Sequence, residues 1–457
     1  MSAALWYLVT VVRESLGTDH DAESLVLALK LSGLSLLGFA FLWVRPRWSS
    51  ETAQRLRAFA DSHYRLLVGL CVLAAGLVAW ATTPTIEFGN GAAGTGYGHD
   101  GIHYGYVAET FNWSTAHAQA PFNARWLAPM LVHASRLDLF TGFHVLNLLC
   151  FALSCLLVAA IPRDLGHSRP IALVAVAAFV CLKPALKYWV FVPITVDAPG
   201  VLLGLLAVHA TLRGRHWLYV LAMLAAVFTR ENLLVLAPFH VLYAIRTGPT
   251  RRAWILSVGL QVLPVAALVL SRLYPPVAPD GTWDPWDDLA LWSERFFFVA
   301  APGRQQMFVL ASINALGILA ILPVLQLRST VGFLWRSYEW LYLAAASLLL
   351  SAVVGADYDR FAMWSLPVVI VLLAESGALA RIGGKAILFL LAGHLVASEL
   401  LFPWASTEHF MLTRFAAHPV DESFRQMSIA CWAIAAYTVL VWARARAAGA
   451  AEQAQKK

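Results

Sequence analysis

Apolar residues along the chain come in long blocks rather than in half-buried stripes. Most blocks run for roughly 18 to 24 residues, and about 20 helical residues at 1.5 Å each match a hydrocarbon core near 30 Å. Each block therefore predicts one membrane-spanning helix, and the fold class is all-α, a polytopic transmembrane helical bundle of about 13 spans. The predicted spans are residues 25–44, 66–83, 141–161, 170–187, 192–212, 216–229, 231–246, 254–274, 306–327, 338–355, 361–380, 385–403 and 425–443.

The composition agrees with this pattern. Hydrophobic residues make up 60% of the chain and charged residues 13%, and the mean hydropathy is +0.66. A soluble domain is nearer to half apolar and a quarter charged, so a soluble fold of this composition could not cover its surface. The cysteines all fall inside apolar blocks, where a free thiol behaves as a small hydrophobe and no disulfide framework or zinc motif is implied. They are Cys71, Cys150, Cys155, Cys181 and Cys431.

The basic residues set the orientation, because Lys and Arg accumulate in the short loops that stay cytoplasmic. One topology places most of the 33 basic residues there. Because these charges are scattered over separate loops, the net charge of +6 is an orientation signal, and nucleic acid is excluded as a partner. The cytoplasmic set is Arg45, Arg47, Arg55, Arg57, Arg65, Arg163, Arg169, Arg213, Arg215, Arg246, Arg251, Arg252, Arg328, Arg336, Arg381, Lys385, Arg444, Arg446, Lys456 and Lys457.

The same pattern divides the chain into three parts. Residues 1–24 lack the basic start and the cleavage site of a secretory signal, and they are predicted to be an interfacial N-terminal segment. Residues 25–443 form the transmembrane domain, with extracytoplasmic loops at 84–140, 275–305 and 404–424. Residues 444–457 are Ala-rich and charged, and we expect a cytoplasmic disordered tail there and no large soluble domain.

Polar residues that are costly to keep at membrane depth collect on the predicted outer side. The first outer loop carries Asp100 between His99 and His103, and an Asp-Gly turn is the alternative interpretation of this acid. The two histidines would share a helical face and, with Asp100, could supply metal ligands, although the Gly-rich run before them favours irregular backbone. Residues 103–117 can form an amphipathic surface helix. Arg125 either serves a site or snorkels to the interface.

Three later junctions add further charges. Asp197 lies between two prolines that loosen its span, and a helix-capping role is the alternative. Arg230 and Glu231 are adjacent between two short apolar runs, and ordinary loop charge is the alternative. The third junction, for which a mutual salt bridge at the interface is the alternative, holds Asp357, Asp359 and Arg360.

The placement of these residues separates two classes of membrane protein. A transporter is expected to keep ionisable residues near the midplane, within broken helices. Here they cluster at one surface, which favours an enzyme whose cavity opens outward and accepts a lipid-anchored substrate. The loop 275–305 supplies Trp283 and Trp286 with several acids, a mixture suited to stacking on sugar rings, and an interfacial aromatic belt is the alternative.

Several short motifs occur in a recognisable order over roughly residues 66–380. They are HDGIHYGYVAE and APFNARWLAPMLVHAS in the first loop, an Asp in a Pro-interrupted span, a TRE turn and a late DYDRF…P turn. This order resembles the GT-C superfamily of membrane glycosyltransferases, and bacterial members above all. The resemblance implies an inverting transfer from a polyprenyl-phosphate-linked sugar to a lipid or glycan of the envelope. It also implies the bacterial inner (plasma) membrane, with the active site on the extracytoplasmic side.

The resemblance further implies roles for individual residues. Asp100 matches the first-loop acid that acts as general base, with Glu109 as the fallback. The departing phosphate would be held by Arg230 and Arg360 first, and then by Arg125, Lys183 and Lys187. Substrate contacts are expected from His99, His103, Tyr104, Asp197, Glu231, Asp357, Asp359, Trp283 and Trp286. Family members differ in their need for a divalent ion, so a metal cofactor at Asp100 and His103 stays open.

Many members of the GT-C superfamily carry a large soluble domain after the helices, so acceptor recognition here is expected from the loops.

Two other classes of function also stay open. A lipid-linked substrate transporter or flippase is one alternative, which internal repeats would support, and no convincing inverted pair is found. A glycan polymerase or ligase is the other, for which several outer-face arginines in one long loop would be expected.

Overall fold

The computed structural model of the chain describes residues 19–83, 99–111, 117–118, 124–248, 250–273, 278–279, 302–353, 362–398, 400 and 420–455. Nearly all of them are helical, as the apolar blocks predict, because a helix satisfies its own backbone hydrogen bonds in lipid. The elements up to Thr247 are α2 (Asp19–Trp43), α3 (Ser50–Ser62), α4 (Tyr64–Thr82), α5 (His99–Thr110), β1 (His117–Ala118), α6 (Leu127–Ser135), α7 (Leu139–Asp164), α8 (Arg169–Val180), α9 (Lys183–Phe191), α10 (Asp197–Leu212), α11 (His216–Thr229), the 3-10 helix η2 (Glu231–Val235) and α12 (Leu236–Thr247). The remaining ones are α13 (Arg251–Gly259), α14 (Val262–Leu273), β2 (Ala278–Pro279), α16 (Pro302–Leu316), α17 (Ile318–Leu325), α18 (Leu327–Arg336), α19 (Tyr338–Val353), the 3-10 helix η3 (Ala362–Ser365), α21 (Leu366–Glu375), α22 (Ala378–Arg381), α23 (Gly384–Ala397) and α25 (Val420–Gln455).

Many of these helices suit a membrane. Six helical stretches among the described residues are long and apolar enough to cross a bilayer, and the bent pair α16–α17 makes a seventh. Five shorter apolar helices accompany them. Every predicted span overlaps at least one helix, so the chain is a multi-pass, all-α membrane protein. The count of about 13 spans stays a prediction.

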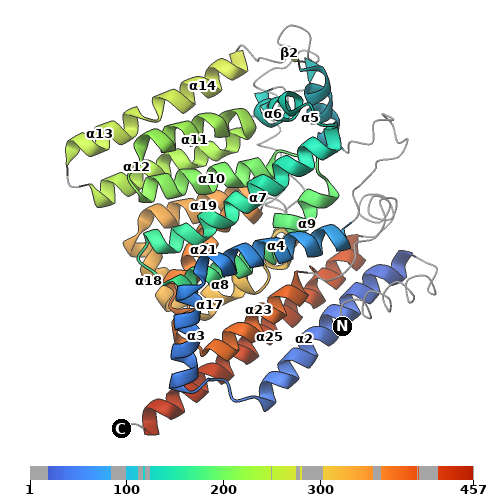
Figure 1. Cartoon of the computed structure of the whole chain (residues 1–457), viewed down its shortest axis with the longest axis vertical. Helices are drawn as coiled ribbons and strands as arrows, with labels where there is room; N and C mark the ends of the chain where they lie inside the picture. Colours follow the sequence, from blue (N-terminus) through green and yellow to red (C-terminus); the bar gives the residue numbers. More distant parts are fainter. Residues whose placement is uncertain are drawn as a thin grey trace.

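The helices form a bundle in which segments distant in sequence lie together (Figure 1). Helices α2, α23 and α25 pack against one another, and α7, α10 and α11 form a second group. The short strands β1 and β2 pair in parallel, with His117 opposite Ala278, so the first loop is joined to the segment that follows α14.

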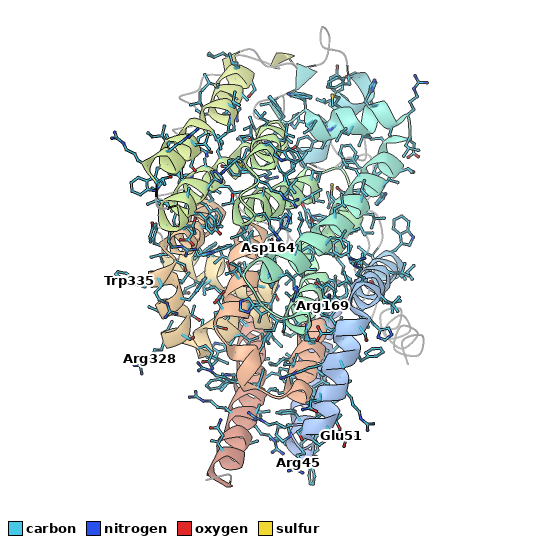
Figure 2. The ribbon with its side chains drawn as sticks, turned by 60° about the vertical axis from the view of Figure 1, so that its left-hand side comes forward. Arg45, Glu51, Asp164, Arg169, Arg328 and Trp335 are labelled. Carbon is cyan, nitrogen blue, oxygen red and sulfur yellow. The ribbon has the colours of Figure 1, made fainter. Side chains whose placement is uncertain are left out.

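Ion pairs join helix ends at one end of the bundle. We call this the basic end and define it by Asp164, Arg213, Arg246 and Glu339. Asp164 at the end of α7 forms an ion pair with Arg213 just beyond α10, and Glu339 at the start of α19 accepts from Arg246 near the end of α12. Figure 2 shows Asp164 near the middle of the view, with Arg328 and Arg45 below it. Arg213 and Arg246 both belong to the set predicted to be cytoplasmic, and the side of the membrane that this end faces stays a prediction.

A sharp bend of 101° separates α16 from α17. Gly317 provides it with a φ of +54°, and a Cβ added there would lie 2.6 Å from Nδ1 of His394. The backbone N–H of Ile318 donates to that Nδ1, so the other ring nitrogen carries the proton and donates to the carbonyl of Ala178. The buried His394 is thus a structural group that stabilises the bend.

The structure differs from the sequence expectations in three places. The helix of the first loop covers His99–Thr110 rather than 103–117, and it includes Asp100, whose charge favours the first turn of a helix. The alternative interpretation of Asp100 as part of an Asp-Gly turn is therefore wrong. Residues 19–24, expected in an interfacial segment, begin α2, and residues 1–18 lie outside the described part. Residues 444–455 continue α25 where disorder was expected, because Ala, Glu and Gln favour helix.

Candidate functional site

The turn between α11 and η2 holds two adjacent charges that both point into the protein. Arg230 donates to the carboxylate of Asp197, the first residue of α10, with Nη1 and Oδ1 2.5 Å apart. The two side chains are 3% and 10% exposed. Val196, rather than Asp197, occupies the N-cap position, so the capping interpretation of Asp197 is wrong. Gly200, one turn further along α10, leaves room for the arginine stem, since an added Cβ would lie 3.8 Å from it.

Glu231 forms the second ion pair with two arginines from distant segments. Arg125 donates to it through Nε and Nη2, at 2.9 Å and 2.7 Å, and Arg272 near the end of α14 reaches it at 3.2 Å. The remaining terminal nitrogen of Arg125 donates to the hydroxyl of Tyr104 on α5, at 3.2 Å. We call these four residues, Tyr104, Arg125, Glu231 and Arg272, the Glu231 clamp.

The electrostatics of the Glu231 clamp keep both partners charged. Burial raises the pKa of Glu231, but Arg125 and Arg272 more than offset it and hold this pKa at about 2. Burial likewise lowers the pKa of Arg125, and Glu231 together with Tyr104 outweighs burial and raises it well above its ordinary value. A paired, buried guanidinium is not a snorkelling one, so the interfacial interpretation of Arg125 is wrong. Arg230 and Glu231 are also buried and paired, so their interpretation as ordinary loop charge is wrong.

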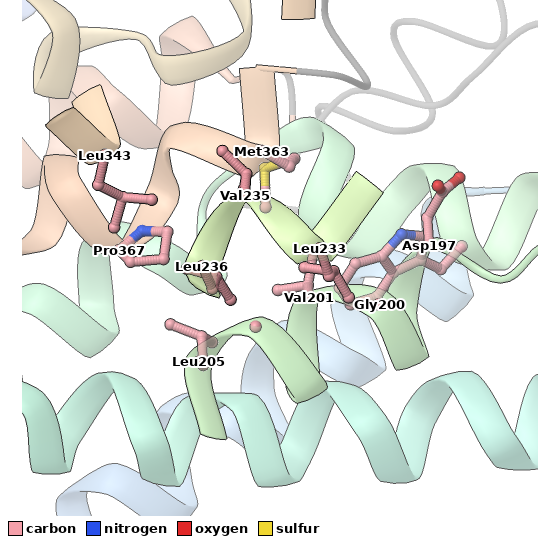
Figure 3. A pocket seen from close by; sticks show the side chains of 12 residues that line it. Asp197, Gly200, Val201, Leu205, Leu233, Val235, Leu236, Leu343, Met363 and Pro367 are labelled. Atoms are coloured by element: carbon pink, nitrogen blue, oxygen red, sulfur yellow. The ribbon is translucent and has the colours of Figure 1, made fainter. Parts of the chain in front are cut away.

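A pocket begins at Asp197 and continues between apolar side chains, and its empty space, open solvent included, is about 580 Å³. Figure 3 shows Asp197 on one side of it and Leu343 and Pro367 on the other. Its wall combines α9, α10, η2, α12, α19, η3 and α21, so residues far apart in sequence enclose it. The lining residues are Trp189, Asp197, Gly200, Val201, Gly204, Leu205, Leu233, Val235, Leu236, Leu343, Met363 and Pro367. Asp197 is the one charged residue among the described residues that line it, so the cavity fits a ligand that is apolar along most of its length.

Helix α5 places the two predicted bases on opposite faces. Tyr104 and Ala108 on its inner face are buried, whereas Glu109 is exposed. Position 100 precedes Tyr104 by one turn and shares its face, while nine residues at about 100° each put position 109 about 180° away from position 100. The helix register therefore favours Asp100 over Glu109 for a role inside the protein. The side chains of His99 and Asp100 lie outside the described part.

The structure brings together some of the predicted site residues. Tyr104, Arg125, Asp197, Arg230 and Glu231 meet in the two ion-pair groups. Lys187 is fully buried on α9, and His103 is half-buried on α5, one residue before Tyr104. The side chain of Lys183 lies outside the described part, as do the whole of Trp283, Trp286, Asp357, Asp359 and Arg360.

A metal site stays a prediction. Within the described ranges, no group of three or more His, Cys, Asp or Glu is placed to hold an ion. His99 and His103 share a face of α5, as their spacing of four predicts, but the carboxylate of Asp100 belongs to the undescribed side chains.

Sequence reasoning missed Arg272. It is one of three arginines, with Arg125 and Arg230, that surround the two acids Asp197 and Glu231. Its signal in the sequence was a basic residue at the end of an apolar span. Interfacial snorkelling produces the same signal, so the pattern could not single it out.

No protein-family model and no curated protein matches the chain. Among solved structures, the chain is similar to an oligosaccharyltransferase from Archaeoglobus fulgidus, which was crystallised with a tethered acceptor peptide containing an NVT sequon. The two are 12% identical with a TM-score of 0.41, and the match covers 85% of this chain and 56% of that one. The chain thus spans little more than half the length of that protein, and neither its activity nor its site residues follow from this likeness.

Proposed function

We propose that the protein is an integral membrane glycosyltransferase that moves a sugar from a polyprenyl-phosphate donor to a lipid or glycan acceptor on the extracytoplasmic side. The observation that carries the proposal is the cavity, which is apolar along most of its wall and has Asp197, paired with Arg230, at its rim. A polyprenyl phosphate has the same division between a long apolar chain and a charged head. The motif order in the sequence, which resembles the GT-C superfamily, supports the same class.

The proposed reaction is a single displacement. Asp100 takes the proton of the acceptor hydroxyl, whose oxygen attacks the anomeric carbon of the donor sugar. The bond from that carbon to the phosphate oxygen breaks, the phosphate keeps the electron pair, and the configuration of the sugar inverts. Arg230 stabilises the charge that develops on the phosphate, because a guanidinium matches phosphate oxygens with two donors. Arg360, Lys183 and Lys187 are further proposed partners of the phosphate.

The test uses the purified full chain in lipid nanodiscs with radiolabelled polyprenyl-phosphate hexoses and pentoses. We expect Asp100→Asn to abolish transfer while the variant still binds the donor lipid. Glu109→Gln is the informative comparison, because position 109 lies on the opposite face of α5. Normal transfer by Asp100→Asn, with loss in Glu109→Gln, would move the role of base to Glu109, and a chelator arm would reveal dependence on a divalent metal.

A flippase is the second candidate, favoured by the 101° bend between α16 and α17. Discontinuous membrane helices are typical of transporters. Movement of a fluorescent polyprenyl-phosphate lipid across the membrane of sealed vesicles, without change to its sugar, would support this class over the transferase.

Mass spectrometry of the cell envelope with and without the protein would identify the missing sugar and its acceptor together.

A further inference from the structure

Glu231 connects segments that are far apart in the chain. Through Arg125 it reaches the linker before α6, through Tyr104 it reaches α5, and through Arg272 it reaches the end of α14. Its side chain is 14% exposed, and that of Arg125 is 9% exposed. A guanidinium that points three of its nitrogens at Glu231 and Tyr104 has most of its donors committed inside the protein. We therefore assign Arg125 a structural role and not the role of a phosphate ligand.

An aromatic contact runs beside this polar one. Trp126, the residue after Arg125, lies against Phe228 near the end of α11, with ring centroids 5.0 Å apart, and against Phe111 just after α5. The strand pair β1–β2 joins the same first loop to the segment after α14. The first loop is thus docked on α11, η2 and α14 at several points, and Glu231 provides the charged one.

The docked part of the loop is the helix that carries the proposed base. Tyr104 is fully buried, and Nδ1 of His133 on α6 lies 2.8 Å from the carbonyl oxygen of Ala108, so α5 is held at both of these residues. Position 100 lies one turn before Tyr104 on a continuous helix. Whatever fixes the helix at Tyr104 therefore also fixes the backbone at Asp100.

We propose that Glu231 is a positioning residue. Through Arg125 and Tyr104 it holds α5, and with it the backbone of the proposed base Asp100, in a set place relative to Arg230, which precedes Glu231 in the chain. The catalytic meaning of this inference rests on the proposed function, but the docking of α5 does not. The two adjacent charges of this turn thus have different partners, because Arg230 pairs with Asp197, which lines the cavity, while Glu231 holds the first loop through Arg125.

The first test measures hydrogen exchange of the whole protein in nanodiscs. Glu231→Gln keeps the shape of the side chain but removes its charge, so we expect amides of 99–111 to exchange at least about tenfold faster while those of α23 stay unchanged. Glu339→Gln is the matched control, since Glu339 is also a buried partner of an arginine but belongs to the basic end. It should leave exchange of 99–111 as in the wild type. Unchanged exchange of α5 in Glu231→Gln would overturn the proposal, whatever the reaction.

A graded variant covers the case in which Glu231→Gln fails to fold. Arg125→Lys keeps the positive charge but replaces the two-pronged contact with a single donor, so amides of α5 should exchange about threefold faster than in the wild type. Equal exchange of α5 in Arg125→Lys and the wild type would also count against the clamp.

The second test measures transfer per folded molecule. A misplaced base should lower kcat by about 10-fold to 100-fold in Glu231→Gln, with the KM for the donor within about threefold. The acid limb of the pH–rate profile should persist, because Asp100 still ionises; loss of this limb would make Glu231 itself the base. A looser α5 with unchanged kcat would refute the positioning role. A looser α5 in a protein that transfers no sugar from any donor would instead leave the clamp in place and refute the proposed function.

Discussion

The basic end of the bundle and the end that holds the cavity both bury acids against arginines, but these pairs have different surroundings. Glu339 is fully buried and binds Arg246, and this pair joins two helix ends. Asp197 is buried and binds Arg230, and this acid also lines the cavity. A buried acid beside an arginine is therefore not enough to mark a functional site, since structural networks make the same contacts. The adjacent cavity is what distinguishes the second pair.

The largest expected effect comes from removing the arginine at each end. Arg230→Met and Arg246→Met each leave a buried carboxylate without its arginine, which should cost about 3–5 kcal/mol and lower the thermal unfolding midpoint in detergent. Transfer per folded molecule should fall by about 10²-fold or more in Arg230→Met, because the phosphate loses its cation. In Arg246→Met, transfer per folded molecule should stay within about threefold of the wild-type value. Stability and transfer are measured on the same preparations.

A double variant sharpens this comparison. Asp197→Asn combined with Arg230→Met leaves no buried charge from the pair, so it should regain part of the lost stability without regaining transfer. Full transfer by Arg230→Met alone would show that Arg230 does not hold the phosphate and that both ends of the bundle are structural.

The same comparison shows what the sequence could predict. The spans are predictable because a helix that crosses lipid must be apolar over the thickness of the hydrocarbon core. Asp197, Arg230 and Glu231 were found because charges between apolar runs are costly. Their pairing was not predictable, since Arg125 and Glu231 are 106 residues apart and neither lies in a pattern that specifies its partner. From the sequence alone Arg125 is a candidate for the phosphate, whereas in the structure its guanidinium binds Glu231.

Helix α5 gives a second example. The Gly-rich run before His99 favours irregular backbone, and Asp100 followed by Gly101 favours a turn. Local propensity was overridden because Tyr104 and Ala108 pack into a small core with Phe143 of α7. That contact brings together residues of two distant helices, and a local pattern in the sequence contains no information about it.

Acid should weaken the Glu231 clamp within a defined range of pH. The pKa of Glu231 is about 2 in the folded protein, against an ordinary value of 4.5, so its stabilising contribution is complete above about pH 4.5 and is lost as the pH falls toward 2. The loss should reach roughly 3 kcal/mol. The difference in unfolding midpoint between the wild type and Glu231→Gln should stay constant from pH 7 to 5 and shrink below it. A constant difference down to pH 3 would contradict this pKa.

A smaller effect is expected from narrowing the cavity. A Cβ at Gly204 on α10 would lie 3.1 Å from Leu233, so Gly204→Val must push this lining residue or occupy the space itself. We expect the KM for the donor to rise by about tenfold, with stability lowered by about 1–2 kcal/mol. Gly76→Val on α4 is the control, because nothing lies within 4 Å of its added Cβ. The control should leave the KM for the donor unchanged. An equal rise of this KM in both variants would show that the cavity does not bind the donor.

The smallest effect is expected where an acid and an arginine pair on the surface. Glu51 and Arg55 of α3 are four residues apart and 2.5 Å from each other, but their side chains are 72% and 79% exposed. Water and salt screen such a pair, so Glu51→Ala should lower stability by no more than about 0.5 kcal/mol, and less in high salt. If Glu51→Ala lowers the unfolding midpoint as much as Glu231→Gln, burial does not account for the strength of the clamp. The ion pairs of the two ends would then have to be distinguished by their effect on transfer alone.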